Sequence, residues 1–326
     1  MKNIAIFICF VIMLFASVIN PVYCEEHSKR YAFSIEPHFG IVYGQSFEAV
    51  YPTPGYHKAE LLSELIWDMK PVFYAAFKLD FGRRDPMSAP GFYSSLNFKI
   101  GFPSDSGIME DRDWKSKENN ALTNFSSHTN KTRSFYWADI IIGASIPVKS
   151  YFHIKPFFSG SWMHFAFTGR DGYYIYARDA GSGSYYPIDD NPNYAELSGD
   201  VIRYQQDWII AALGFSAGAD ITSFFSIDFL FQISPFAYCF AKDDHLKTGY
   251  IFQDYTIFGL FLEPKLKLSY LLDNLSFSLE AAYRYIGLTR GPSFNKKVND
   301  SFFYKDGEAG AGLSLFDLSL RVKYSF

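Results

Sequence analysis

Two short groups of acidic and imidazole side chains have the spacing that hydrolytic chemistry needs. They are Asp111-Arg112-Asp113-Trp114 and Asp243-Asp244-His245. In an extended chain, side chains two positions apart lie on one face, so Asp111 shares a face with Asp113. By the same spacing, Asp243 shares a face with His245. If both faces look into one opening, four polar groups converge there.

Such a convergence predicts the activation of water. Asp243 would fix the tautomer of His245 and strengthen it as a base. Asp111 and Asp113 would share a proton, because two close carboxylates resist joint ionisation, and would hold the same water from the other side. The expected reaction is attack of water on a peptide carbonyl. Taken separately, an Asp-x-Asp pair is also compatible with solvated charge or a weak cation site, and His245 is one of seven histidines.

The elements that must position these groups are indicated by strict alternation of apolar and polar residues. At the C-terminal end, six apolar residues alternate with polar ones: Phe316, Leu318, Leu320, Val322, Tyr324 and Phe326. The segments 258–270 and 275–285 repeat the pattern on either side of a turn at Asp273-Asn274. This period of two predicts long half-buried strands joined as hairpins.

The whole chain divides into ten such strands with two alternating sets of connections. The strands are expected near 31–50, 62–81, 91–103, 134–148, 151–168, 202–219, 223–240, 250–270, 275–289 and 313–326. Longer loops are expected near 51–61, 104–133, 169–201, 241–249 and 290–312, with short turns between the other strand ends. An even number of strands, with short turns at one end and long loops at the other, is typical of a bacterial outer-membrane barrel.

Composition agrees with a membrane barrel. Aromatic residues make up 20% of the 326 residues, yet the mean hydropathy is only -0.04. After the N-terminal segment no run of eighteen apolar residues occurs, and otherwise only a closed barrel satisfies its backbone in lipid. We therefore expect an all-β, ten-stranded antiparallel transmembrane barrel that rises above the outer membrane, with the candidate site facing outward. With 30 Lys and Arg against 34 Asp and Glu, nothing indicates a nucleic-acid partner.

The N-terminus reads as an export signal over residues 1–24. Lys2 precedes the apolar run 4–19, which is short for a spanning helix. Cleavage is expected after Cys24, with Ser17 as another candidate position and a lipid anchor on Cys24 as an alternative. Residues 25–326 then form a single barrel domain. Cys239 is its only remaining cysteine if Cys24 leaves with the signal, so no internal disulfide is expected.

At several places the sequence resembles the omptins, ten-stranded outer-membrane proteases with an Asp-Asp pair facing an Asp-His pair across the mouth. The matching pieces are Glu48-Ala-Val-Tyr51, Leu62-Ser63-Glu64-Leu65 before Trp67, Met109-Glu-Asp-Arg-Asp-Trp114, Phe167-Thr-Gly-Arg-Asp-Gly-Tyr-Tyr-Ile-Tyr176, Tyr204-Gln205-Gln206, Asp243-Asp-His245 and Lys323-Tyr-Ser-Phe326. The resemblance implies that Asp111 and Asp113 form one catalytic couple and that Asp243 and His245 form the water-activating dyad. It also implies that Glu48 binds the basic side chain before the cleaved bond.

Two departures from the omptin pattern concern specificity and lipid. Ala241 stands where the family has a second acidic pocket residue, which puts the preference for basic substrates in question. His164 stands where the family has an arginine that helps to hold lipopolysaccharide, an activating lipid of omptins. Dependence on this lipid is therefore left open.

The function expected from the sequence is an aspartic-type endopeptidase that cuts extracellular polypeptides near basic residues by Asp-His activated water, with outer-membrane lipid as its other partner. No metal and no cofactor are expected, since no Gly-rich phosphate loop, His-Glu-x-x-His or zinc-spaced cysteine pair occurs, and a requirement for lipopolysaccharide as activating lipid is left open. The alternative is a non-catalytic barrel that acts as an adhesin or surface-binding protein. A diffusion porin is disfavoured, because ten strands leave an interior that side chains fill.

Overall fold

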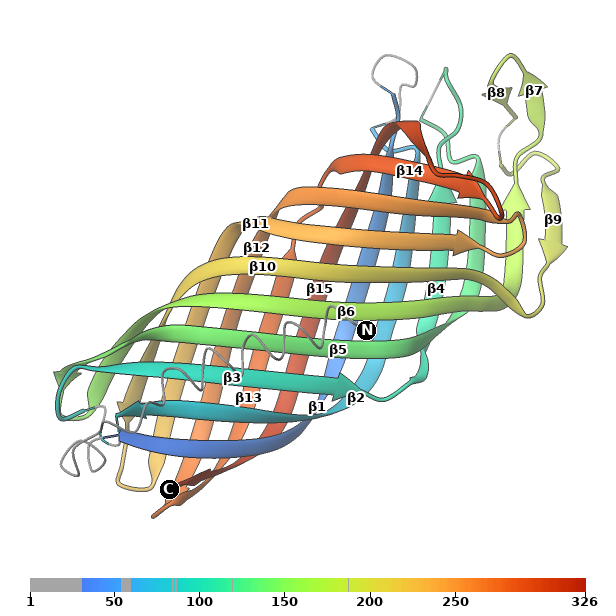
Figure 1. Cartoon of the computed structure of the whole chain (residues 1–326). Coiled ribbons are helices and arrows are strands. Elements are labelled where there is room, and N and C mark those ends of the chain that lie inside the picture. The colour runs from blue at the N-terminus through green and yellow to red at the C-terminus, as the bar shows by residue number, and fades with distance from the viewer. Residues whose placement is uncertain (1–30, 54–59, 84, 86, 119, 187) are drawn as a thin grey trace.

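The computed structural model describes residues 31–326 except 54–59, 84, 86, 119 and 187 (Figure 1). The predicted export signal over residues 1–24 lies outside the described residues. Within them, no helix has the length and apolarity that a membrane crossing requires.

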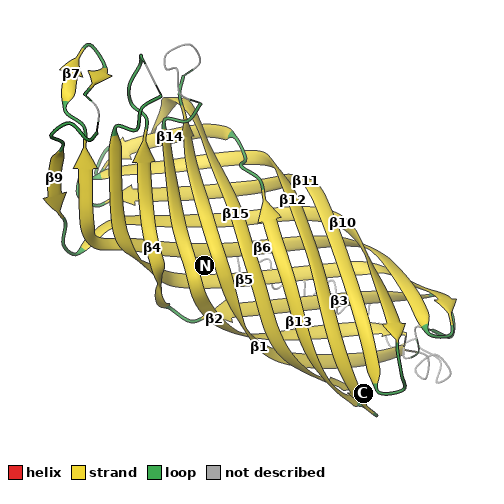
Figure 2. Ribbon diagram, turned by 180° about the vertical axis from the view of Figure 1, so that it is seen from behind, coloured by secondary structure: helices red, strands yellow, loops and turns green. Residues whose placement is uncertain are grey.

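The chain forms a ring of ten antiparallel strands, as predicted (Figures 1 and 2). In ring order they are β1 (Tyr31–Tyr51), β2 (Ser63–Arg83), β3 (Gly91–Gly101) continued by β4 (Ser104–Asp113), β5 (Asn124–Lys149), β6 (Phe152–Tyr176), β10 (Asp200–Asp220), β11 (Phe225–His245), β12 (Tyr250–Leu272), β13 (Leu275–Ile286) continued by β14 (Gly291–Lys297), and β15 (Phe303–Ser325). Pairing of β1 with β15 closes the ring. The short strands β7 (Asp179–Gly181), β8 (Ser184–Tyr185) and β9 (Asn193–Glu196) belong to the loop between β6 and β10.

The strands extend further into the predicted outer loops than the alternation indicated. β4 occupies part of the predicted loop 104–133, and β5 starts already at Asn124. In this upper part of β5, the buried side chains are the polar residues Asn124, Ser126, His128, Asn130 and Thr132. Because polar side chains face inward there, the change from apolar to polar that marks a strand in sequence is lost.

The outer wall carries a belt of exposed apolar side chains around the lower part of the ring. It includes Phe39, Phe73, Ile142, Phe158, Leu213, Phe236, Leu260, Phe277 and Leu320. On β11 the outward aromatic residues end at Phe240, and the next outward residues are Lys242 and Asp244, which form an ion pair with N–O distance 2.9 Å. An apolar band ending at aromatic residues is typical of a barrel in lipid, so the upper strands stand above the belt.

The interior is filled rather than open. Trp67 stacks on Phe167 and Tyr204, with ring centroids 5.7 and 5.4 Å apart. Below this aromatic layer, Arg321 binds Glu36 and Glu280 at 2.7 and 2.6 Å. The aromatic layer joins β2 to β6 and β10 across the ring, whereas the ion pairs of Arg321 link β15 to its neighbouring strands β1 and β13.

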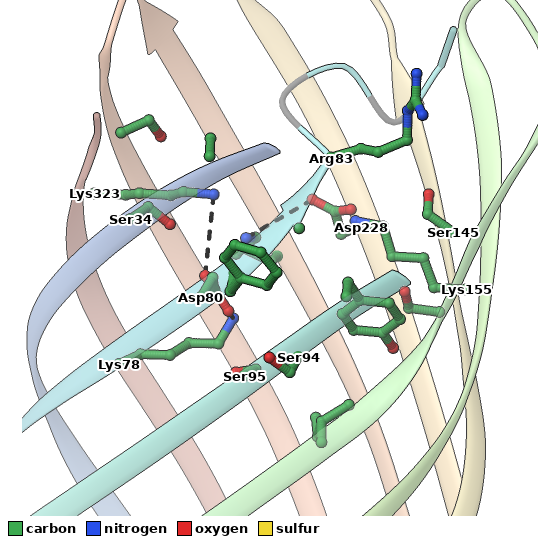
Figure 3. A pocket seen from close by; sticks show the side chains of 18 of the residues that line it. Ser34, Lys78, Asp80, Arg83, Ser94, Ser95, Ser145, Lys155, Asp228 and Lys323 are labelled. Atoms are coloured by element: carbon green, nitrogen blue, oxygen red, sulfur yellow. Dashed lines mark ion pairs between the residues drawn. The ribbon is translucent and has the colours of Figure 1, made fainter. Parts of the chain in front are cut away.

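At the lower end lies a cavity of about 390 Å³ lined mainly by charged and hydroxyl side chains (Figure 3). Two ammonium groups flank Asp80, that of Lys78 at 2.9 Å and that of Lys323 at 4.0 Å. Asp228 lies 3.9 Å from the ammonium of Lys267. Ion pairs thus hold the carboxylates of Asp80 and Asp228 in this part of the interior.

Candidate active site

Asp111 and Asp113 lie at the upper end of β4, on the face that points into the mouth. Asp111 pairs across the strands with Leu65 and Ser126, and Asp113 is buried. The predicted loop position is therefore wrong in detail, because both residues belong to a strand. The shared inner face that their spacing predicts is present.

The backbone of β4 is distorted below Asp111 and Asp113, and this distortion sets the direction of the end of the strand. The run from β3 is interrupted at Pro103, which has no backbone N–H to give to a ladder. The register of β4 against β5 then shifts between Asp105 and Ile108, and Gly107 has a φ of 100°. Asp68 holds this bulge, since its Oδ2 accepts a hydrogen bond from the Ile108 backbone at 3.2 Å. Bulges of this kind re-aim the residues that follow them.

Asp243 and His245 end β11, and their side chains meet. Nε2 of His245 lies 2.5 Å from Oδ2 of Asp243. Asp243 is buried with its side chain 2% exposed, whereas the imidazole is 35% exposed. Phe252 on β12 packs edge-on against the ring at 5.3 Å. With Nε2 held by the carboxylate, Nδ1 is the nitrogen left to accept a proton from water.

The electrostatics of the site couple the two pairs. Burial, followed by the negative charge of Asp113, raises the pKa of Asp111 to about 7. Burial opposes the imidazolium of His245, but the charge and hydrogen bond of Asp243, with smaller contributions from Asp111 and Asp113, raise its pKa to about 9. The aspartate pair and the dyad therefore lie close enough to act on each other's protonation. All four residues predicted from the sequence come together in one mouth.

Two further polar contacts anchor the aspartate pair. Ser63 donates a hydrogen bond to Oδ1 of Asp111 at 3.3 Å, and the ammonium of Lys115 lies 2.6 Å from Oδ2 of Asp113. Tyr176, at the end of β6, lies near both carboxylates, and burial together with their charges raises its pKa to about 12. The mouth thus offers a cation, hydroxyl groups and an aromatic ring beside the couple.

Ser126 and His128 were not singled out from the sequence, yet they complete the wall beside Asp111. The His128 ring spans the Asp171 carbonyl, 2.5 Å from Nδ1, and the Ser126 hydroxyl, 3.0 Å from Nε2. Burial lowers the pKa of His128, which favours a neutral ring with its proton on Nδ1 toward the carbonyl. Nε2 then accepts the Ser126 proton, and the Ser126 oxygen is left to accept from a water near Asp111. The polar i, i+2 series from Asn124 to Thr132 is the sequence signal that marks them.

A layer of tied side chains forms the floor of the mouth. Ser46 donates to Oε1 of Gln206 at 2.8 Å, and Nε2 of Gln206 donates to the Phe47 carbonyl at 2.9 Å. Trp208 donates to the same Oε1 at 3.0 Å. These bonds connect β1 directly to β10 across the ring, so the floor of the mouth is held in place.

The structure also places the residues linked to binding. Glu48 lies on the inner face of β1 and is 3% exposed, and Ala241 lies on the inner face of β11 and is 2% exposed. His164 faces the outer wall, where Nδ1 lies 2.9 Å from Oδ1 of Asp207. In the described part of the chain, no three His, Cys, Asp or Glu side chains are arranged to hold a metal ion.

Comparison with known proteins identifies a family and solved structures of similar fold. The sequence model of the Omptin family matches residues 29–326. The outer-membrane protease OmpT from Escherichia coli superposes with a TM-score of 0.78 at 17% identity, covering 90% of this chain and 97% of that chain. The translocator domain of the autotransporter NalP from Neisseria meningitidis reaches only 0.34 at 10% identity, with coverages of 90% and 88%. The comparison with curated protein sequences finds no match.

Proposed function

Because the chain belongs to the Omptin family and is an outer-membrane β-barrel, we propose that it is an endopeptidase that hydrolyses extracellular polypeptides at the mouth of the barrel. The observation that supports this most directly is the Asp243–His245 contact on β11, placed within electrostatic range of Asp111 and Asp113 on β4. The two pairs come from different strands, so the arrangement depends on the fold.

The first step in the proposed mechanism is proton removal from a water molecule. In the protonation state in which the ring of His245 is neutral and Asp111 carries the shared proton, Nδ1 of His245 takes the proton of the water while Asp243 stabilises the imidazolium that forms. The hydroxide attacks the peptide carbonyl carbon. The carbonyl oxygen gains negative charge in the resulting tetrahedral species. A protonated Asp111 can donate a hydrogen bond to that oxygen, because its pKa of about 7 keeps part of the population protonated at neutral pH.

Collapse of the tetrahedral species completes the reaction. The imidazolium of His245 returns its proton to the leaving amine nitrogen, the C–N bond breaks, and the carboxylic acid product forms. Asp113 pairs with the ammonium of Lys115, and its negative charge helps Asp111 to keep its proton. No covalent enzyme intermediate is required.

Cleavage of a fluorogenic peptide library by the refolded barrel tests the proposal. The experiment compares the wild type with His245→Ala and Asp111→Ala, each with and without lipopolysaccharide. Both variants are expected to lose about 100- to 10,000-fold in rate. Asp244→Asn is the matched control, because Asp244 faces the outer wall and binds Lys242. Heat-modifiable migration on gels checks that each barrel is folded.

The lipid arms of this experiment address the outer wall. We propose that lipopolysaccharide contacts the face that carries His164, and a His164→Arg variant tests whether the family's arginine increases the response to lipid. The competing proposal is a non-catalytic adhesin, for which the exposed tyrosines Tyr186 and Tyr194 of the β6–β10 loop provide a surface. Absence of cleavage by the folded wild type under every lipid condition would favour the adhesin.

A further inference from the structure

Ala241 leaves an acidic pocket residue missing from β11, and the neighbouring strand carries one at the same height. Asp254 on β12 is the direct cross-strand partner of Ala241. The two side chains are 2% and 3% exposed, so both point into the ring. Directly opposite residues of an antiparallel pair have Cβ atoms about 5 Å apart on the same face. A carboxylate thus occupies the region that an aspartate at position 241 would reach.

Glu48 lies in the same region, on β1, which is separated from β12 by β14 and β15. Glu48 on β1 and Asp254 on β12 are both almost fully buried. After burial itself, the charges of both carboxylates help to raise the pKa of the Tyr204 hydroxyl. One phenol therefore senses both carboxylates, which shows that they share one part of the interior just below the catalytic residues.

The wall between the two carboxylates is made of small residues. Ser293 on β14 pairs with Asp254, and Ala311 on β15 pairs with Glu48. Ala309 lies two positions from Ala311 and pairs with Gly291. All of these side chains are short, whereas the bulky aromatic layer lies on β2, β6 and β10.

The adjacent lysine does not neutralise this region. Lys242 follows Ala241 in the sequence, but successive strand residues point to opposite faces. Its ammonium binds Asp244 on the outer wall at 2.9 Å. A cationic side chain that enters between Glu48 and Asp254 gains Coulomb attraction from both.

The depth of the region fits a long basic side chain. Asp254 lies two residues below Phe252, the partner of Asp243, which corresponds to about 7 Å along the strand. Lysine and arginine carry their charge at the end of stems of about this length. The water activated by His245 and Asp243 would then attack the backbone carbonyl of the same substrate residue whose charge Asp254 binds.

Resting on the proposed peptidase function, we propose that Asp254 determines specificity by supplying, from β12, the second carboxylate of the pocket for a lysine or arginine before the cleaved bond. The acid lost from β11 at Ala241 is replaced on the next strand. The preference for basic substrates is thereby retained.

Matched peptides that differ only in the residue before the cleaved bond test this role. Arginine is compared with its neutral isostere citrulline, and lysine with alanine. Asp254→Asn keeps shape and removes charge, so we expect kcat/KM for the arginine and lysine peptides to fall about 10- to 100-fold. Cleavage of the citrulline peptide should change little. Asp244→Asn serves as the control, with its carboxylate on the outer wall.

A relocation variant separates loss of charge from loss of structure. Ala241→Asp combined with Asp254→Ala moves the carboxylate back to β11, and we expect it to restore the arginine preference. If the wild type cleaves and Asp254→Asn keeps the same ratio of arginine to citrulline cleavage, Asp254 has no role in specificity.

Binding provides a readout that does not need turnover. Fluorescence anisotropy with peptides N-methylated at the scissile bond should show tighter binding of arginine than of citrulline, and Asp254→Asn should remove the difference. If the folded wild type cleaves nothing but shows this binding pattern, the peptidase function fails while the assignment of the pocket stands. Equal binding of both peptides by the wild type overturns the assignment.

Discussion

Replacing Asp243 by asparagine should lower the pKa of His245 far more than any other single substitution near the dyad. The carboxylate lies 2.5 Å from Nε2 and is the main group that raises this pKa to about 9 from an ordinary value of 6.5. Asparagine keeps the size of the side chain and can still accept a hydrogen bond, but it removes the charge. The burial that opposes the imidazolium remains.

The magnitude follows from the pKa and from the exposure of the ring. A rise from 6.5 to about 9 corresponds to about 3 kcal/mol in favour of the imidazolium. Because the side chain is 35% exposed, screening by water reduces the usable part to about 1–2 kcal/mol. We therefore expect Asp243→Asn to lower the titration midpoint of His245 by about one pH unit or more.

The assay is an NMR titration of the barrel in detergent micelles with selectively ¹³C-labelled histidine. The Cε1–H signal of His245 is assigned from its absence in His245→Ala. Asp244→Asn is the control, since it removes a neighbouring carboxylate that faces the outer wall. An unchanged His245 midpoint in Asp243→Asn, or an equal decrease in the control, would refute the dyad as the source of the raised pKa.

Three further outcomes are expected. The pH profile of kcat/KM should be bell-shaped, with limbs near pH 7 and pH 9. The coupled site holds two protons below these values, one shared proton between them and none above them, and only the form with one proton is active. Ser126→Ala should lower kcat about tenfold or more with little change in KM, because a water contact rather than substrate binding is lost, which steady-state kinetics will show. Arg321→Met should destabilise the barrel by about 3–5 kcal/mol in urea unfolding, because it leaves Glu36 and Glu280 buried without their cation.

The raised pKa of His245 also predicts how the free energy of unfolding changes with pH. A group with a higher pKa in the folded state stabilises the fold fully below its unfolded value, here 6.5, and this contribution is lost as the pH rises through about 9. Asp243→Asn should reduce this dependence. Unfolding midpoints measured at pH 6 and pH 10 should then differ less in the variant than in the wild type.

The ring and the placement of the four candidate residues could be predicted because they depend on local patterns. Alternation with a period of two identifies the lower strands, where apolar residues meet the outer belt, and spacing of two places Asp243 beside His245. The upper part of β5 could not be delimited in this way, because its buried side chains are polar. Asp254 was not found for a different reason: its relation to Ala241 is set by the register between β11 and β12, which no local pattern encodes.

The outward aromatic residues of β11 end at Phe240. The height of the candidate site above this residue determines how close to the bilayer a bond could be cut. His245 lies five positions after Phe240 on β11, which is about 16 Å along the strand. The usual tilt of the strands reduces this to roughly 12 Å of height above the membrane. This height therefore sets a minimum distance from the bilayer for bonds that can reach the candidate site. Bonds close to the bilayer in neighbouring membrane proteins lie below its reach, whereas stalks, loops and free polypeptides that extend past this height can enter the mouth.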